Sequence, residues 1–163
     1  AWLGERLGDV KIVRTMPNTP ALVGEGITGV CKNNLVTEDE FAYVLKLLSS
    51  FGLAEAIPES LMDAVVSVSG SSPAYVFLFI EAMADAAVAD GMPRAQAYKF
   101  AAQAVLGSAK MVLETGKHPA ELKDMVCSPA GTTIEAVRVL EEKGFRGAVM
   151  DAMKACTAKA KGI

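Results

Sequence analysis

Residues 128–133, Ser-Pro-Ala-Gly-Thr-Thr, bring hydroxyl groups and a glycine together where a helix is predicted to begin. Thr132 and Glu135 have the spacing of a capping box, with Thr132 as the N-cap. A helix start offers backbone N–H groups and the positive end of the helix dipole, which suit a carboxylate or a phosphate. The pattern therefore predicts either an anion-binding helix start or an ordinary cap, which is the commoner use of such residues.

Three further segments place polar groups where a ligand could bind. Residues 16–18, Met-Pro-Asn, follow a predicted strand, and open α/β folds bind ligands beyond strand ends. Glu59 begins a predicted helix, where the helix dipole alone would favour a carboxylate. Residues 69–73, Ser-Gly-Ser-Ser-Pro, are equally well explained as a hydroxyl-rich kink between two helices.

Composition narrows the classes of function. The chain has 163 residues, 52% of them hydrophobic, and a formal charge of -3, which gives no electrostatic case for nucleic acid or an anionic membrane surface. The apolar run at 75–80 meets Glu81 and Asp85 too early for a membrane span. Three distant cysteines argue against disulfides and metal sites and favour a cytoplasmic protein. Because the chain does not begin with Met, we expect it to be part of a longer product.

Two regions of different character divide the chain. In residues 1–58, strands are predicted at 11–16, 26–31 and 53–57, with a helix launched by the Thr37–Glu40 capping box and stopped at Gly52. This order resembles the last strands of a Rossmann-type sheet domain. Three short strands bury little apolar surface alone, so we expect the rest of that domain to be missing.

Residues 59–163 are predicted to form an all-helical domain, which makes the fold α+β and mainly α. The predicted helices span 60–68, 73–90, 93–115, 119–126 and 133–143, with a last one after Gly144. The long ones are rich in alanine and carry apolar residues on more than one face. Because a helical domain of this size cannot bury all of that surface, we expect two or more chains to interlock as a homodimer or larger homo-oligomer.

Several motifs, in order and with consistent spacing, resemble those of pyrroline-5-carboxylate reductases. They are Met16-Pro-Asn-Thr-Pro20, Ser69-Gly-Ser-Ser-Pro-Ala-Tyr75, Ala82-Met-Ala-Asp85, Gly91-Met-Pro-Arg94, Gly107-Ser-Ala-Lys-Met111, His118-Pro119, Leu122-Lys-Asp124 and Ser128-Pro-Ala-Gly-Thr-Thr133. The resemblance covers the chain from about Val13 onward. The family's GxGxxG-type turn, which holds the cofactor pyrophosphate, does not occur in this sequence.

The resemblance implies an oxidoreductase that transfers hydride from NADPH, or less efficiently NADH, to the imine of 1-pyrroline-5-carboxylate and so makes L-proline. It implies that Thr133 hydrogen-bonds the ring nitrogen and that Gly131, Thr132 and Thr133 offer N–H groups to the substrate carboxylate. Glu59 and Ser128 are implied to line the substrate site. Met16, Pro17 and Asn18 are expected to lie near the nicotinamide, because the turn after a strand is where open α/β folds bind ligands. Without the glycine turn, the chain alone is expected to be inactive and to bind no cofactor tightly.

Two residues depart from the family's pattern. Ala130 stands where the family usually has glycine, and it fits without strain only if its φ is negative. Met125 replaces a residue that is often polar in the family, so no side-chain hydrogen bond is expected from this position.

Two alternatives remain open from the residues themselves. The chain could be a helical oligomerisation module without chemistry, since most of its informative residues could be caps and helix stops. It could also belong to another imine or hydroxyacid dehydrogenase with Lys110 as proton donor. The only histidine, His118, precedes Pro119 and is predicted to lie at a helix entry rather than to act as a catalyst.

Overall fold

The computed structural model describes residues 2–162, and the chain divides into two compact units. The first unit comprises the residues up to Ala74 together with those from Ala152 onward, and the second comprises Tyr75–Asp151. Both unit boundaries fall within helices. The domain boundary expected between residues 58 and 59 stays a prediction.

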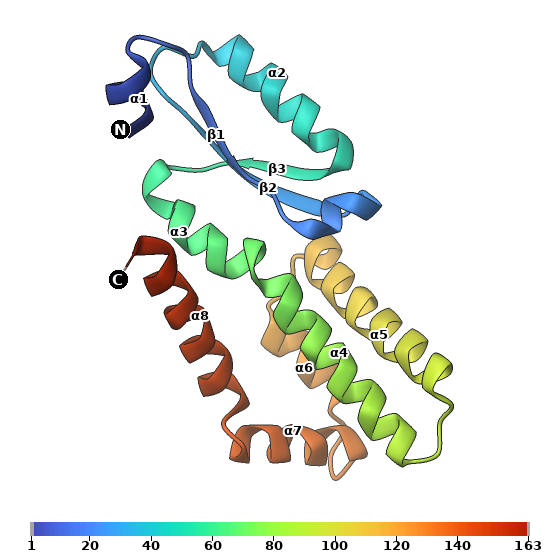
Figure 1. Ribbon diagram of the computed structural model, residues 1–163. Helices are drawn as coiled ribbons and strands as arrows, with labels where there is room; N and C mark the ends of the chain where they lie inside the picture. Colours follow the sequence, from blue (N-terminus) through green and yellow to red (C-terminus); the bar gives the residue numbers. More distant parts are fainter. Residues whose placement is uncertain (1, 163) are drawn as a thin grey trace. The chain divides into compact units, whose positions relative to one another are not determined.

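The first unit contains a three-stranded sheet in the order β1-β2-β3 (Figure 1). Strand β1, Val13–Met16, runs antiparallel to β2, Gly26–Lys32, and β2 runs parallel to β3, Gly52–Ala56. The expected strands and the mixed, mainly helical fold class are confirmed. Two short elements were not predicted, the helix α1, Trp2–Leu7, and the 3-10 turn η1, Thr19–Val23.

Helix α2, Glu38–Leu48, connects β2 to β3 and packs against one face of the sheet (Figure 1). Its predicted capping box is confirmed, because the Thr37 side chain accepts from Glu40 N and the Glu40 carboxylate accepts from Thr37 N at 3.0 Å. Phe41 of α2 and Val30 of β2 belong to the buried core between them. A short 3-10 turn η2, Ser49–Phe51, leads into β3.

On the face of β2 opposite α2, the short helix α3, Met62–Val65, packs closely against the strand at Gly29. A Cβ built on Gly29 would lie 3.1 Å from Ile57 Cδ1 and 3.1 Å from Val65 Cγ1, so the absence of a side chain lets these two residues approach the strand. Val65 ends α3, which follows the 3-10 turn η3, Glu59–Leu61. The completely buried Met62 anchors this short helix.

The break expected at residues 69–73 is much shorter in the structure. A π-helical turn η4, Val66–Gly70, continues α3, and only a bend at Ser71 separates it from α4, Ser72–Ala89. Its i to i+5 bond runs from Ser71 N to Val66 O at 2.8 Å. The interruption is shorter than expected because Gly70 still lies within the π-helical turn, and Pro73 lies in the first turn of α4, where a residue without an N–H is tolerated.

The remaining helices follow the predicted order. They are α5, Arg94–Thr115, α6, Pro119–Val126, α7, Thr132–Glu142, and α8, Phe145–Lys161. His118 is the N-cap of α6, where its Nδ1 accepts from Ala120 N at 3.2 Å, so the expected helix-entry role is confirmed.

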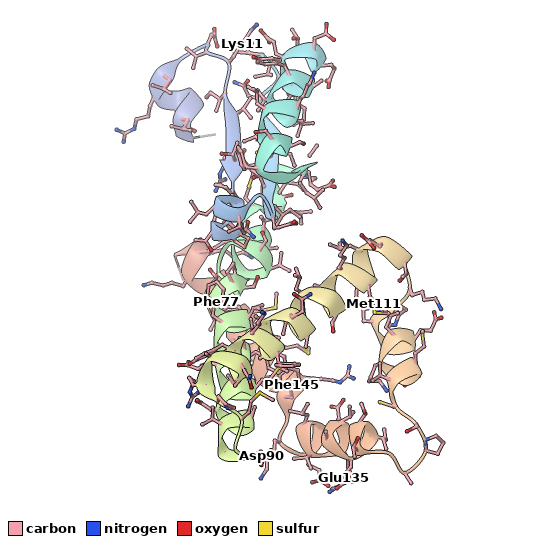
Figure 2. The ribbon with its side chains drawn as sticks, turned by 90° about the vertical axis from the view of Figure 1, so that its right-hand side faces the viewer. Lys11, Phe77, Asp90, Met111, Glu135 and Phe145 are labelled. Atoms are coloured by element: carbon pink, nitrogen blue, oxygen red, sulfur yellow. The ribbon has the colours of Figure 1, made fainter. Side chains whose placement is uncertain are left out.

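Large apolar side chains remain exposed on α4 and α5. Figure 2 labels one on each helix, Phe77 and Met111, which are 62% and 45% exposed. Leu78 and Phe100 are 68% and 66% exposed. These helices therefore have apolar surface that the rest of the second unit does not cover.

The helical run Glu59–Ala89 is long and apolar enough to cross a membrane. Its most apolar 18-residue stretch has a mean hydropathy of 1.4. Only 6% of that stretch is buried within the chain. One such helix is weak evidence for a membrane span, because a core helix of a soluble protein has the same composition. Glu81 and Asp85 interrupt the apolar surface, and Asp85 forms an ion pair with Arg94.

The contact between Lys11 and Glu40 makes part of the stability of the first unit dependent on pH. The Lys11 ammonium, followed by the Thr37 hydrogen bonds, lowers the pKa of Glu40 to about 2 from an ordinary value of 4.5. The contribution of the contact is therefore complete above about pH 4.5 and is lost as the pH falls towards 2. We expect Lys11→Met to raise the pKa of Glu40 in a carbon-detected NMR titration, whereas Lys46→Met leaves it unchanged. Identical Glu40 titration curves in wild type and Lys11→Met would contradict this account.

Candidate functional site

The start of α7 in the second unit differs from the predicted capping box. The N-cap is Gly131 rather than Thr132, and no side chain caps the helix among the described residues. The Glu135 carboxylate instead accepts from Arg138, one turn along the helix, at 2.6 and 3.0 Å. This ion pair also lowers the pKa of Glu135. The capping-box prediction is therefore wrong.

Without a side-chain cap, backbone N–H groups at the start of α7 have no hydrogen-bond acceptor within the helix. The first helical bond runs from Glu135 N to Gly131 O at 3.4 Å, so the N–H groups of Thr132 and Thr133 precede the internal bonding pattern. Gly131 N already donates to Ser128 O at 3.0 Å. The donors that remain suited to an anion are therefore those of Thr132, Thr133 and Ile134, with the helix dipole behind them.

Ser128, Gly131, Thr132 and Thr133 lie within one tight turn and the helix start that follows it. A Cβ on Gly131 would lie only 2.3 Å from Ser128 Oγ, so a side chain at this position would displace the serine hydroxyl. Thr132 is exposed and Thr133 is half-buried. The turn and helix start thus gather the three side-chain hydroxyls of Ser128, Thr132 and Thr133 close to the helix-start N–H groups.

Ala130 adopts the strained backbone conformation that the sequence analysis named as a risk. Its φ is +56°, and it is the only described residue other than glycine with a positive φ. For a residue with a Cβ, this left-handed conformation costs roughly 1–2 kcal/mol. The turn tolerates alanine, but glycine would fit it without strain.

We expect Ala130→Gly to stabilise the protein by about 1 kcal/mol or less, because relief of about 1–2 kcal/mol of strain is partly offset by the greater freedom of glycine in the unfolded chain. Urea unfolding of this chain measures the difference. The matched control is Ala136→Gly in the interior of α7, which should lose about 1 kcal/mol. Equal losses from both substitutions would show that the strain at Ala130 has no energetic consequence.

Residues 16–18 are built into the first unit by their own hydrogen bonds. Asn18 Oδ1 accepts from Ile27 N at 2.9 Å, and Asn18 Nδ2 donates to Ser69 O at 3.2 Å. Met16 Cε lies against Gly70, 2.6 Å from where a Cβ would be. Pro17 between them is exposed. The strand end predicted near a cofactor therefore contacts the π-helical turn, and the two segments named in the sequence analysis are neighbours.

Glu59 lies in the same unit, where Arg14 Nη1 donates to its carboxylate at 3.3 Å. Both residues line an open pocket of about 550 Å³ that also includes Cys31. Burial, followed by the charge of Glu59, raises the pKa of the Cys31 thiol, which favours its neutral form. Sequence reasoning missed Arg14; the available signal was a basic side chain in a strand two residues before Met16.

Two other side chains that the sequence singled out, Lys110 and Met125, lie on exposed helix surface. Lys110 is two-thirds exposed and forms an i, i+4 ion pair with Glu114 at 3.4 Å on the surface of α5. Met125 is 63% exposed on α6. The described residues contain no group of three or more His, Cys, Asp or Glu side chains placed to hold a metal ion. The threonine-bearing helix start remains the strongest chemical candidate in the second unit.

Comparison with known proteins agrees with the arrangement of these elements. Residues 59–163 match the family model described as pyrroline-5-carboxylate reductase dimerisation. The chain is 69% identical over 162 residues to the pyrroline-5-carboxylate reductase of Escherichia coli, and the match covers 99% of this chain and 60% of that protein. The Synechocystis enzyme is 52% identical over 147 residues, covering 90% of this chain and 55% of its own length.

Solved structures give the same result. A Plasmodium falciparum pyrroline carboxylate reductase with NADP bound matches with a TM-score of 0.91 at 38% identity, covering 98% of this chain and 65% of that one. The Coxiella burnetii enzyme matches with a TM-score of 0.93 at 36% identity, covering 98% and 60%. The chain spans about three-fifths of the length of the curated relatives named above. From its folded elements and from these matches, the chain belongs to the pyrroline-5-carboxylate reductase family.

Proposed function

We propose that the intact protein containing this chain reduces 1-pyrroline-5-carboxylate to L-proline with NADPH or NADH. The observation that supports this most strongly is the start of α7, where Thr132 and Thr133 offer backbone N–H groups and a hydroxyl at one uncapped helix end. The substrate is a small anion with a ring imine, and this helix end has one kind of group for each part. Family membership supplies the reaction class.

In this proposal the N–H groups of Thr132 and Thr133 hold the substrate carboxylate, with the helix dipole favouring its negative charge. The Thr133 hydroxyl hydrogen-bonds the ring nitrogen, because a hydroxyl can donate to it or accept from its protonated form. Ser128 and Gly131 shape the turn, and Glu59 is proposed as a further substrate-site residue. Hydrogen bonds that strengthen as charge changes on the imine would lower the barrier to reduction.

The nicotinamide cofactor supplies the hydride when it is bound. The residues of this chain fit only part of such a cofactor. Gly24 follows the 3-10 turn η1 and Gly26 begins β2, which pairs antiparallel with β1, so these glycines do not form the pyrophosphate-binding turn between a strand and a helix. The turn at residues 16–18, with the exposed Pro17, is proposed to face the nicotinamide end. We therefore expect this chain alone to bind no cofactor tightly and to be inactive.

The proposed partner is a second copy of the chain, because α4 and α5 expose apolar side chains within the region matched to the dimerisation family. A cytoplasmic location is proposed because the three cysteines, Cys31, Cys127 and Cys156, are odd in number and far apart in the sequence, a pattern that favours a reducing compartment over a disulfide framework. No nucleic acid or membrane partner is proposed.

The decisive experiment uses the intact protein. It is mixed with NADPH and 1-pyrroline-5-carboxylate, and both the loss of NADPH absorbance and the appearance of L-proline are followed. We expect NADPH loss and proline formation in equal amounts. NADPH loss without proline would point to another imine reductase, and no reaction by a folded, NADPH-binding protein would favour a module without chemistry.

A further inference from the structure

Asn18 links two segments of the first unit through both polar atoms of its side-chain amide. The oxygen must face Ile27, whose N–H donates to it at 2.9 Å, and the nitrogen must face Ser69, whose carbonyl accepts from it at 3.2 Å. The orientation of the amide is therefore set by the chemistry of its two partners. Its side chain is half-buried, so these bonds have limited competition from water.

The bond to Ile27 extends the sheet beyond the end of β1. Met16 pairs with Gly29 in the antiparallel register, which places Asn18 opposite Ile27 two residues further along. The strand pairing between β1 and β2 ends at Met16. The Asn18 side chain takes over, because its Oδ1 accepts the Ile27 N–H that a backbone carbonyl would otherwise receive.

The bond to Ser69 repairs a defect in the helical run. In an α-helix the Ser69 carbonyl would accept from the N–H of residue 73, but that residue is Pro73 and has none. The next N–H, that of Ala74, donates to Ser71 O at 3.1 Å instead. Asn18 Nδ2 therefore donates to the carbonyl that Pro73 leaves without a helical partner.

Met16 reinforces this connection from the same turn. Its terminal methyl occupies the space that a side chain at residue 70 would need, since a Cβ there would lie 2.6 Å from Cε. The turn at residues 16–18 thus touches the π-helical turn Val66–Gly70 twice, once through the amide of Asn18 and once through Met16. The position of one turn fixes the position of the other.

We propose that Asn18 is a positioning residue: it does not hold the cofactor through its amide, which is already bonded within the protein, but fixes the turn at residues 16–18 against the π-helical turn. This inference rests on the proposed function, in which that turn faces the nicotinamide. Its consequence is that loss of the Ser69 bond weakens NADPH binding through the displaced Met16 and Pro17.

Asn33 provides a matched control at the other end of the same pair of strands. Its Oδ1 accepts from Ile12 N at 3.1 Å and its Nδ2 donates to Val10 O at 2.8 Å, the same pattern of one backbone donor and one backbone acceptor. Asn33→Asp and Asn18→Asp each retain the acceptor and replace the donor by a second acceptor. Asn33 shares the pocket of Glu59, so the comparison is made on NADPH affinity and not on imine turnover.

The test measures the NADPH Kd of the intact protein by fluorescence titration, together with urea unfolding and amide hydrogen exchange at Ile27. We expect Asn18→Asp to raise the Kd roughly 10-fold, the size of a lost hydrogen bond with an unsatisfied partner. Asn33→Asp should stay within about twofold at a similar loss of stability. Ile27 should remain protected in Asn18→Asp, because its acceptor is retained.

Equal Kd values for the two variants, or an unchanged Kd in Asn18→Asp, would overturn the positioning role even if the wild-type protein reduces the imine. A wild-type protein that binds NADPH but reduces no imine would overturn the proposed function alone. A wild-type protein that binds no NADPH would overturn both.

Discussion

Replacing Thr133 by alanine in the intact protein is expected to lower kcat/KM roughly 10- to 100-fold, because it removes a hydrogen bond to the imine nitrogen worth about 1.4–3 kcal/mol. Thr133 is half-buried in the first turn of α7, so the fold should tolerate the loss of its hydroxyl. The measurement is steady-state kinetics of NADPH oxidation at varied 1-pyrroline-5-carboxylate. Thr133→Ser, which retains the hydroxyl, should recover most of the activity.

Two comparisons make this result specific. Thr132→Ala should have a smaller effect, because Thr132 is proposed to bind the carboxylate through its backbone N–H, which alanine retains, and its hydroxyl has no assigned role. Lys110→Ala removes an exposed ion pair on α5 and should leave kcat/KM within about twofold, as surface ion pairs contribute little. An enzyme that retains full turnover in Thr133→Ala but loses it in Lys110→Ala would instead use the lysine as a proton donor.

A charge introduced on the apolar surface of α4 or α5 is expected to separate the subunits. Leu78 and Phe100 are 68% and 66% exposed in the single chain, and burial of each against a partner would stabilise a dimer by about 1.5–3 kcal/mol. The pair of substitutions Leu78→Glu and Phe100→Glu should therefore raise the dimer Kd by at least about 100-fold. Sedimentation over a range of concentrations measures this change.

The control for the dimer prediction is Leu47→Glu on α2. Leu47 is also large, apolar and 51% exposed, but it lies outside residues 59–163, which match the dimerisation family. It should not change the sedimentation coefficient. A monomeric wild-type chain at micromolar concentration would contradict the interlocked-helix hypothesis, as would dissociation caused by Leu47→Glu and not by the changes on α4 and α5.

Local sequence signals predicted the elements well. Pro119 and the residues around it predicted a helix at 119–126, and α6 has these bounds. Thr37 and Glu40 predicted a capping box, which forms. These predictions succeed because caps, proline starts and glycine stops involve residues only a few positions apart, so the sequence contains both partners.

The start of α7 shows where the same reasoning fails. Thr132 and Glu135 have the spacing of a capping box, but Arg138 competes for the glutamate, and the helix begins one residue earlier at a Gly131 cap. Similarly, nothing in the letters assigns the sign of φ at Ala130, which is +56°. A pattern predicts which residues can interact locally, but competing partners decide which of them do.

By itself, the sequence determined the family, the order of strands and helices, and the threonine pair as the strongest chemical candidate, since all of these depend on residue types and short spacings. Only the tertiary structure decided the π-helical turn and the role of Asn18, whose bond to Ser69 joins residues 51 positions apart. Such a bond forms only when the folded sheet brings the two turns together. Local spacing in the sequence does not show that residues 18 and 69 become neighbours.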